Sequence, residues 1–568
     1  MKKDFIWYLE RIMIWIAVII TFILSMLCLF TTNYADATPL HIAKIKTDNF
    51  IISILVFITV VVVFTVIREF LKKKKITIKE CYACVFMMLF VFIMGNIWIF
   101  TVKCISTTDQ RTVVKSAVAF IAGDYTILEK GYYMYIYPFQ LGLAAYTELV
   151  FRIIGRESDR ALQMINVLSV PFTYFFLYKI SNRIFKNKTT NLLTIILCIA
   201  CLPLFFFTPF VYGDVITQTL VVAAAYFSLK YMDTRKIRWS ILVIVLITIA
   251  TQLKTNTLIA AIAFMILYVF FGIRERKPVI IAQAVILFAC IQLVQTGVVT
   301  FYEARSGIEL TDGAPRTLHI AMGLQEGTRS AGQYNGFSLN PYVDNDCNAQ
   351  VANAIAVESI KESIKTFAAD PAYMLDFFYR KISSEWVDPT YNSFFSTDYY
   401  CQPLTGVAKS IYSGDLNTVV EEFMNQYQFL LIFCSCGFFF LKRRKITLDQ
   451  MGLMIIFLGG FAFHIIWEAN GRYCLPYFVL LIPYGAAGMR EFMDLTGRHL
   501  PGAKKEKLQE MSGTDNLTKK PEDQETDFYE IEEIPTTLEA TFNQVFDEKF
   551  EISYEDPYAM PDEQSMRE

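Results

Sequence analysis

The feature that most constrains this chain is a series of roughly twelve apolar runs, each long enough to cross a bilayer as a helix of about 20 residues. The composition agrees, since 54% of the residues are hydrophobic and only 19% are charged. Soluble chains carry about 25% charged residues. The first run, Ile12–Phe30, is too long for a cleaved signal peptide and is expected to remain as a helix. The sequence therefore predicts an all-α polytopic protein of the cell membrane.

The distribution of Lys and Arg sets the expected topology, because short cytoplasmic loops are enriched in both. Basic clusters stand between the apolar runs at 72–75, 179–188, 235–238, 274–277 and 442–445. All of them are cytoplasmic only if the segment Tyr137–Ile154, interrupted by Glu148 and Arg152, lies along the membrane surface instead of crossing it. We therefore expect residues 106–160 to form one external loop with two surface helices, near 110–122 and 137–154.

This topology gives about twelve crossings with both termini in the cytoplasm. The expected crossings are 12–30, 50–70, 82–104, 161–181, 189–211, 215–233, 239–253, 255–272, 279–301, 426–441, 449–467 and 474–489. The expected domains are two N-terminal membrane helices (1–81), a catalytic membrane core (82–301), an extracytoplasmic loop domain (302–425), C-terminal membrane helices (426–490) and a cytoplasmic tail (491–568).

Two of these domains differ from the membrane body in composition. The long loop contains helical-looking runs at Ala349–Ala368 and Ala372–Trp386, so we expect a small α-rich domain there. From Gly502 to Glu568 there are nineteen acidic residues against seven basic ones. We expect that acidic tail to be largely disordered.

Four charged residues fall at the external ends of expected crossings: Asp109, Asp214, Lys254 and Arg472. The amphipathic run after Asp109 would cover it and lower the local dielectric, which makes a carboxylate a useful base. Lys254 could hold a phosphate as a point charge, and Arg472 could hold one as a fork. Structural roles are the alternatives, since Asp214 suits a turn, Lys254 could reach towards water and Arg472 could pair with Glu468.

Most of the twelve cysteines lie inside apolar runs, as small core residues commonly do. Cys347 and Cys401 instead lie in the long polar loop. They could form a disulfide if that loop is extracytoplasmic, and the sequence leaves this pairing open.

The order of the motifs is more informative than any one of them. An external Asp109 precedes an amphipathic run and a Tyr-Pro surface segment, and Gly155 precedes a helix that opens Leu162–Leu168. A second external Asp, a Leu-Lys-Thr turn and the motif Arg472-Tyr-x-x-Pro476 complete the order. Over roughly residues 82–490 this pattern resembles the GT-C superfamily of polyprenyl-phosphate-dependent glycosyltransferases. It is most similar to the protein O-mannosyltransferase and aminoarabinose-transferase branch.

The resemblance implies a transfer of sugar from a polyprenyl phosphate to an acceptor hydroxyl at the extracytoplasmic face, with inversion. Asp109 would be the general base and Asp214 the second catalytic acid, while Lys254 and Arg472 would bind the donor phosphate. Substrate contacts are expected from Tyr137, Gln140, His319, Glu468 and Tyr473. The acceptor could be a glycan, another polymer or a protein, and no nucleic acid is expected as a partner.

Two features depart from the family pattern. Many relatives carry two adjacent acids in the first loop, whereas Gln110 follows Asp109 here, so a divalent metal is possible but not assumed, and no metal ligand or other cofactor is assigned. Two crossings also precede the catalytic core where many relatives have none. The competing interpretations are a twelve-helix transporter, which would place ionisable residues at mid-membrane within a two-fold repeat, and a polysaccharide polymerase or ligase.

Overall fold

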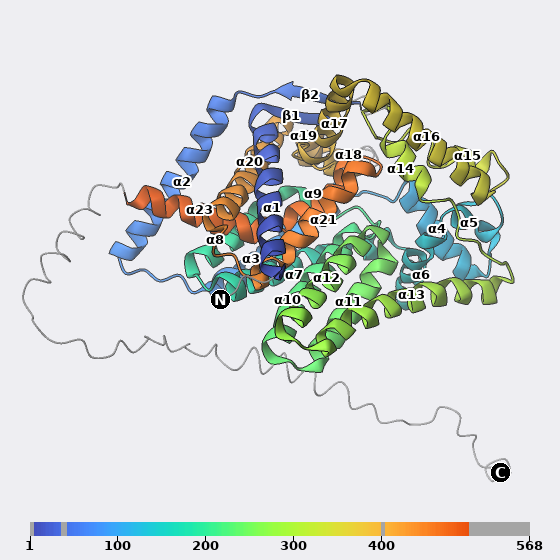
Figure 1. The fold of residues 1–568 in the computed structure, drawn as a ribbon, viewed down its shortest axis with the longest axis horizontal. Coiled ribbons are helices and arrows are strands. Elements are labelled where there is room, and N and C mark those ends of the chain that lie inside the picture. The colour runs from blue at the N-terminus through green and yellow to red at the C-terminus, as the bar shows by residue number, and fades with distance from the viewer. Residues whose placement is uncertain (1–4, 36–41, 399–403, 499–568) are drawn as a thin grey trace, which may run out of the picture. The chain divides into compact units, whose positions relative to one another are not determined.

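The computed structural model describes residues 5–35, 42–398 and 404–498, and these are almost entirely helical (Figure 1). The predicted all-α class is confirmed for this part of the chain, apart from one small hairpin. Cys401 and the tail after residue 498 lie outside the described residues, so the predictions of a disulfide and of a disordered tail remain predictions.

Eight helices in the described ranges are long and apolar enough to cross a membrane, which makes this a multi-pass membrane protein. They are α1 (Phe5–Phe30), α2 (Phe50–Lys73), α3 (Glu80–Val102), α7 (Asp159–Phe185), α10 (Asp214–Thr234), α12 (Leu258–Glu275), α13 (Pro278–Ser306) and α20 (Asn417–Lys442). Three shorter apolar helices are α8 (Lys188–Ala200), α11 (Ile237–Leu253) and α21 (Gly452–Ile466). The number of twelve crossings remains a prediction.

Two expected crossings are interrupted. The segment 189–211 contains α8 and then the short α9 (Leu202–Phe206), which begins at a Leu-Pro step. The segment 474–489 is shared by α22 (Gly471–Val479) and α23 (Ile482–Gly497), again with a proline at the start of the second helix. Proline lacks the N–H that a continuous helix needs, so apolar composition alone concealed both breaks.

The segment between α3 and α7 consists of short helices, as expected. It contains α4 (Thr108–Ala122), η1 (Thr126–Leu128), α5 (Tyr133–Ile136), η2 (Pro138–Gln140) and α6 (Leu141–Ile154). Helix α6 packs closely on α11, where a Cβ added at Gly142 would lie 2.3 Å from the carbonyl oxygen of Gln252. Buried Glu148 joins α6 to α13 by accepting hydrogen bonds from Tyr302 Oη at 2.7 Å and Arg305 Nη1 at 3.0 Å. These contacts fix the segment that carries Asp109.

The long polar loop contains both expected helices and several short ones. The helices are α14 (Thr317–Gly323), α15 (Asn340–Val343), α16 (Ala349–Ala369), α17 (Pro371–Trp386), α18 (Ser393–Asp398) and α19 (Gly406–Ser413). Two further one-turn helices are η3 (Thr255–Thr257) and η4 (Leu448–Gln450). Asn348 caps α16 and Asp370 caps α17 by accepting backbone N–H groups.

A two-stranded hairpin between α1 and α2 was not predicted. Strands β1 (Thr31–Ala35) and β2 (Ala43–Thr47) pair antiparallel, and Figure 1 shows them beside α17. The backbone N–H of Asn33 donates to the carbonyl of Val387 at 3.2 Å, and that of Ala43 donates to the carbonyl of Arg329 at 3.1 Å. The first two membrane helices are thereby joined to the long loop.

The basic clusters gather at the other end of the helices. Arg183 at the end of α7 pairs with Asp233 at the end of α10, and Arg235 pairs with Glu275 at the end of α12. Arg274 reaches Glu10 of α1, with Nη1 3.1 Å from Oε1. Helices α7, α10 and α12 therefore present basic ends on one side of the bundle, whereas α10 begins on the opposite side at Asp214.

Candidate active site

Asp214 and Lys254 form a buried ion pair at the ends of two neighbouring helices. Lys254 Nζ lies 3.0 Å from Asp214 Oδ2, with side-chain exposures of 14% and 11%. Gly213, at φ 84°, starts α10, and a Cβ there would lie 2.7 Å from the carbonyl oxygen of Leu253. This close approach brings the start of α10 against the end of α11 and so brings the two charges together.

Arg472 adds a second cation to the same carboxylate. Its Nε lies 4.0 Å from Asp214 Oδ1, and its guanidinium lies 5.0 Å from the ring of Phe210 and 5.4 Å from that of Tyr212. The side chain of Asn470 caps α22 by accepting a hydrogen bond from the backbone N–H of Arg472. This bond fixes the position of the arginine in the first turn of the helix. Lys254 and Arg472 thus both face the carboxylate of Asp214, and their positive charges could also bind an anion.

Burial alters the basicity of Lys254. Desolvation lowers the pKa of its ammonium to about 8, although the negative charge of Asp214 opposes that shift. Tyr212 lies beside the ammonium, with the ring centroid 4.3 Å from Nζ and the carbonyl oxygen 3.4 Å from it. The ammonium is thus held by a carboxylate, a carbonyl and an aromatic face at once.

Asp109 lies in the first turn of α4. Its side chain is accessible, yet the surrounding protein reduces its hydration and raises its pKa. The positive charges of Arg472 and Lys254 oppose the rise, and the negative charge of Glu468 adds to it. The charges of all three residues therefore act on the carboxylate of Asp109.

Aromatic and amide side chains from the first loop line the space beside Asp109. Gln140 Nε2 donates to Tyr212 Oη at 2.7 Å, and the hydroxyl of Tyr133 lies 3.1 Å from the same atom. The ring of Tyr137 packs edge-on against that of Tyr133 at 5.2 Å. Tyr212 therefore joins the first loop to the Asp214 turn.

The turn between α21 and α22 carries Glu468. This carboxylate is 8% exposed and lies 3.4 Å from His319 Nδ1, while the imidazole stacks on Trp467 at 5.0 Å. Tyr473 follows in the same turn, beside the guanidinium of Arg472 at 5.2 Å. All nine residues selected from the sequence thus lie in or beside one site, although they come from five separate segments.

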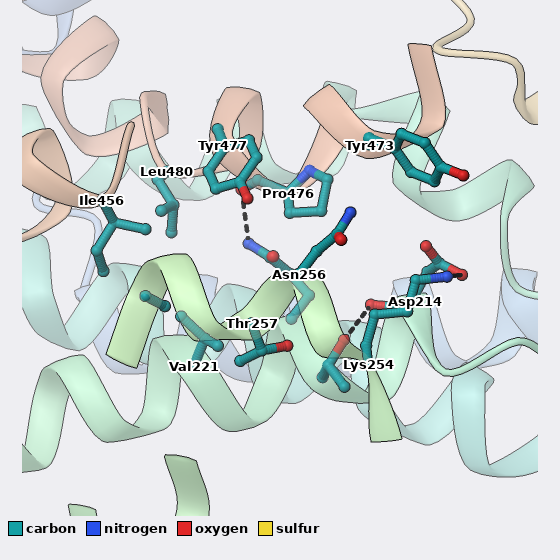
Figure 2. A pocket seen from close by; sticks show the side chains of 13 residues that line it. Asp214, Val221, Lys254, Asn256, Thr257, Ile456, Tyr473, Pro476, Tyr477 and Leu480 are labelled. Carbon is teal, nitrogen blue, oxygen red and sulfur yellow. Dashed lines mark hydrogen bonds and ion pairs between the residues drawn. The ribbon is translucent and has the colours of Figure 1, made fainter. Parts of the chain in front are cut away.

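A narrow slot leads away from the ion pair (Figure 2). Its polar end is formed by Asp214, Lys254 and Asn256. Val221 of α10 and Leu480 after α22 line it further along, so its character changes from charged to apolar. Figure 2 shows Tyr473, Pro476, Tyr477, Leu480 and Ile456 along one wall. This gradient in polarity is the one that an amphipathic molecule with an anionic head would match.

The donor set does not fit a divalent metal. Gln110 Oε1 accepts the backbone N–H of Val211 at 2.9 Å and is buried, so the position where relatives carry a second acid serves the fold. No group of three or more His, Cys, Asp or Glu side chains in the described ranges could hold a metal ion. No step of the reaction is therefore assigned to one.

A family model described as dolichyl-phosphate-mannose-protein mannosyltransferase matches residues 141–294. Over these residues the chain is similar to that family of membrane glycosyltransferases. The matched segment includes Asp214 and Lys254, whereas Asp109 and Arg472 lie on either side of it. No curated protein matches the chain.

Two residues of the site were missed in the sequence. Tyr212 stands two positions before Asp214, in a turn that the sequence did indicate. Lys381 of α17 is fully buried, and its Nζ donates to the carbonyl oxygens of Gly323 and, at 2.7 Å, Trp467. It ties α14 to the Glu468 turn, and no local sequence signal separates it from a surface lysine of an amphipathic helix.

Proposed function

We propose that this glycosyltransferase moves a sugar from a polyprenyl-phosphate donor to an acceptor hydroxyl at the extracytoplasmic face. The observation that supports it best is the slot, because a polar end with Lys254, next to Arg472 across Asp214, that continues between apolar walls matches a lipid phosphate. A transporter would instead place its ionisable groups near mid-membrane. Here Asp214, Lys254 and Arg472 lie at helix ends.

The donor phosphate would lie between Lys254 and Arg472. Lysine acts there as a point charge and arginine as a planar fork, and both compensate the charge that develops on the leaving phosphate. Asp214 keeps the two cations together and favours the charged form of Lys254. The isoprenoid chain would follow the apolar walls at Val221 and Leu480.

Asp109 would act as general base. It takes the proton from the acceptor hydroxyl while that oxygen bonds to the anomeric carbon. The bond from the anomeric carbon to the phosphate oxygen breaks, and its electron pair leaves with the polyprenyl phosphate. Attack opposite the leaving group inverts the anomeric centre. The raised pKa of Asp109 makes it a stronger base than an ordinary aspartate.

The side of the membrane on which the site would lie follows from the charges at the two ends of the helix bundle. Basic clusters lie at the end remote from Asp214, and positively charged loops are retained in the cytoplasm. The site would therefore face outward, where lipid-linked sugars meet envelope acceptors.

The test uses membranes that contain the full chain and a radiolabelled synthetic polyprenyl-phosphate hexose. Wild-type protein should release polyprenyl phosphate and pass label to an acceptor of the membrane, whereas Asp109→Asn should lose transfer by at least about a hundredfold. The matched control is Asp124→Asn in the same loop. Asp124 caps a turn by accepting the backbone N–H of Thr126 at 3.0 Å, and asparagine can do the same.

Two results would contradict the proposal. Full transfer by Asp109→Asn would remove the base from the mechanism. Movement of intact donor across the membrane without its cleavage would instead indicate a transporter.

A further inference from the structure

A hydrogen bond crosses the slot just beyond its charged end. Gln218 of α10 is 4% exposed, and its Nε2 donates to the carbonyl oxygen of Pro476 of α22 at 3.0 Å. Both residues line the slot, and Figure 2 shows Pro476 on the side opposite Val221. The amide of Gln218 therefore joins the two walls of the slot.

The position of Gln218 on α10 puts it on the path that a lipid would follow. Residues three and four apart lie on the same face of a helix. Asp214 stands four residues before Gln218, and Val221 stands three residues after it. All three line the slot. The hydrogen bond thus lies between the charged end and the apolar walls, where the first isoprene unit of a bound polyprenyl phosphate would pass.

The volume enclosed by the slot is too small for such a chain. It is about 40 Å³, which is room for about three water molecules at about 10–15 Å³ each. A cavity of about 150 Å³ accommodates benzene, a molecule of six carbons. A five-carbon isoprene unit needs space of the same order. Entry of the lipid therefore requires the two walls to move apart.

Each wall is packed tightly on a neighbour of its own. The start of α10 is packed on α11 through Gly213, as described above. A Cβ added at Gly460 of α21 would lie 2.4 Å from the ring of Tyr477 of α22. Helix α10 is thus attached to α11 and α22 to α21, whereas Gln218 and Pro476 join one pair of helices to the other. Opening between α10 and α22 therefore breaks this bond.

The acceptor of the bond belongs to the end of a helix. The last four carbonyls of an α-helix lack a partner within it, and Pro476 carries one of these four in α22. In a continuing helix the N–H of Leu480 would donate to Pro476, but it donates to Tyr477 at 3.2 Å instead. Gln218 supplies the missing partner from another helix. The net contribution of such a bond is small, so it can open and close.

We infer that the bond from Gln218 to Pro476 is a latch that holds the slot closed and breaks when the donor lipid enters. The inference rests on the proposed function and deepens it, because it concerns how the polyprenyl chain reaches the slot. A latch lowers the fraction of protein that is ready to bind, and the apparent Kd rises by the same factor. Loss of a latch therefore tightens binding, whereas loss of a purely structural bond does not.

The experiment measures binding of a fluorescent short-chain polyprenyl phosphate to the full chain in detergent, by stopped flow and by titration. Gln218→Met keeps the length of the side chain and removes its N–H donors. It should raise the association rate constant and lower the Kd, each by about tenfold, the factor expected for one hydrogen bond. The dissociation rate constant should stay unchanged.

Gln428→Met is the matched control. Gln428 of α20 is fully buried, and its Nε2 donates to the carbonyl oxygens of Trp386 at 3.1 Å and Asp388 at 3.2 Å. It does not line the slot. The control should lower the thermal stability of the protein and leave the association rate constant as in wild type.

The outcomes separate the latch from the proposed function. If Gln218→Met does not fold, Gln218→Asn decides, because its amide is one carbon shorter and falls short of Pro476. Binding that is slower, weaker or unchanged in the folded variant overturns the latch, and cleavage of a polyprenyl-phosphate hexose by wild-type protein then shows that the transferase stands. Wild-type protein that neither binds polyprenyl phosphate nor cleaves the donor overturns both.

Discussion

Lys254 Nζ lies 3.0 Å from Asp214 Oδ2 at the head of an otherwise largely apolar slot. A lone ammonium at that depth would be costly to bury, and the carboxylate offsets part of the cost. Under the proposed function, the pair would keep a cation in place for the anionic head group before the lipid binds.

Replacing the ammonium should weaken donor binding more than turnover. Lys254→Gln removes the point charge and leaves Asp214 with Arg472 alone, so the donor KM should rise at least about tenfold. Steady-state kinetics with the polyprenyl-phosphate hexose would measure this. Lys115→Gln on the exposed face of α4 is the control, and equal effects of the two substitutions would refute a phosphate contact.

The pH dependence of kcat/KM for the donor should report the protonation state of Lys254. Lys254 has a pKa of about 8 and is cationic below that value and neutral above it. The kcat/KM for the donor should therefore fall above about pH 8. In Lys254→Arg the guanidinium stays charged, and this alkaline limb should disappear below about pH 10. An unchanged limb in that variant would assign the titration to another residue.

Removing the negative charge of Asp214 should move the alkaline fall in kcat/KM to lower pH. Asp214 raises the pKa of Lys254, so Asp214→Asn should lower it and move the fall in kcat/KM to lower pH. Rate profiles of the two proteins between pH 6 and 9, a range set about the lysine pKa, would show the shift. A profile that moves to higher pH would contradict the ion pair.

Glu148 should matter for stability. Glu148→Gln weakens the contacts to Arg152, Arg305 and Tyr302 and leaves Arg305 without its carboxylate, which should cost about 3 kcal/mol. Thermal unfolding in detergent measures the loss. Glu157→Gln breaks an exposed pair with Arg111 and should cost less than about 1 kcal/mol. Similar losses of stability in the two variants would show that the buried contacts of Glu148 contribute no more than an exposed ion pair.

The topology can be tested by cysteine labelling. Thr108 and Lys188 are both exposed and lie at opposite ends of the bundle. Cysteines placed there, in a background with Cys81, Cys347 and Cys401 replaced, should react with a membrane-impermeant maleimide from opposite sides. Labelling of both from one side would overturn the expected arrangement.

The sequence predicted most membrane helices, but it did not predict where two of them are interrupted. Apolar length identified the membrane helices because a bilayer imposes a fixed span. It missed the breaks before Pro203 and Pro483, since both lie within apolar runs. The basic clusters kept α6 out of the list of crossings, which placed Asp109 and Asp214 on one side.

The features that the sequence could not predict are those that depend on tertiary contacts. Gln110 had no visible purpose until its contact with the Val211 N–H appeared. The short polar segment between α1 and α2 carried no strand signal strong enough to predict the hairpin. Its strands depend on contacts with Val387 and Arg329, more than 280 residues away in the chain.

Lys381 has a consequence for biogenesis. Its amine bridges carbonyl oxygens at Gly323 and Trp467, so the long loop cannot close until the segment that follows α21 has been synthesised. Asp109 emerges early and Arg472 late, and no shorter nascent chain holds a complete site. Under the proposed function, activity would begin only when the final helices have been inserted, so a partly synthesised chain would not act on lipid donors.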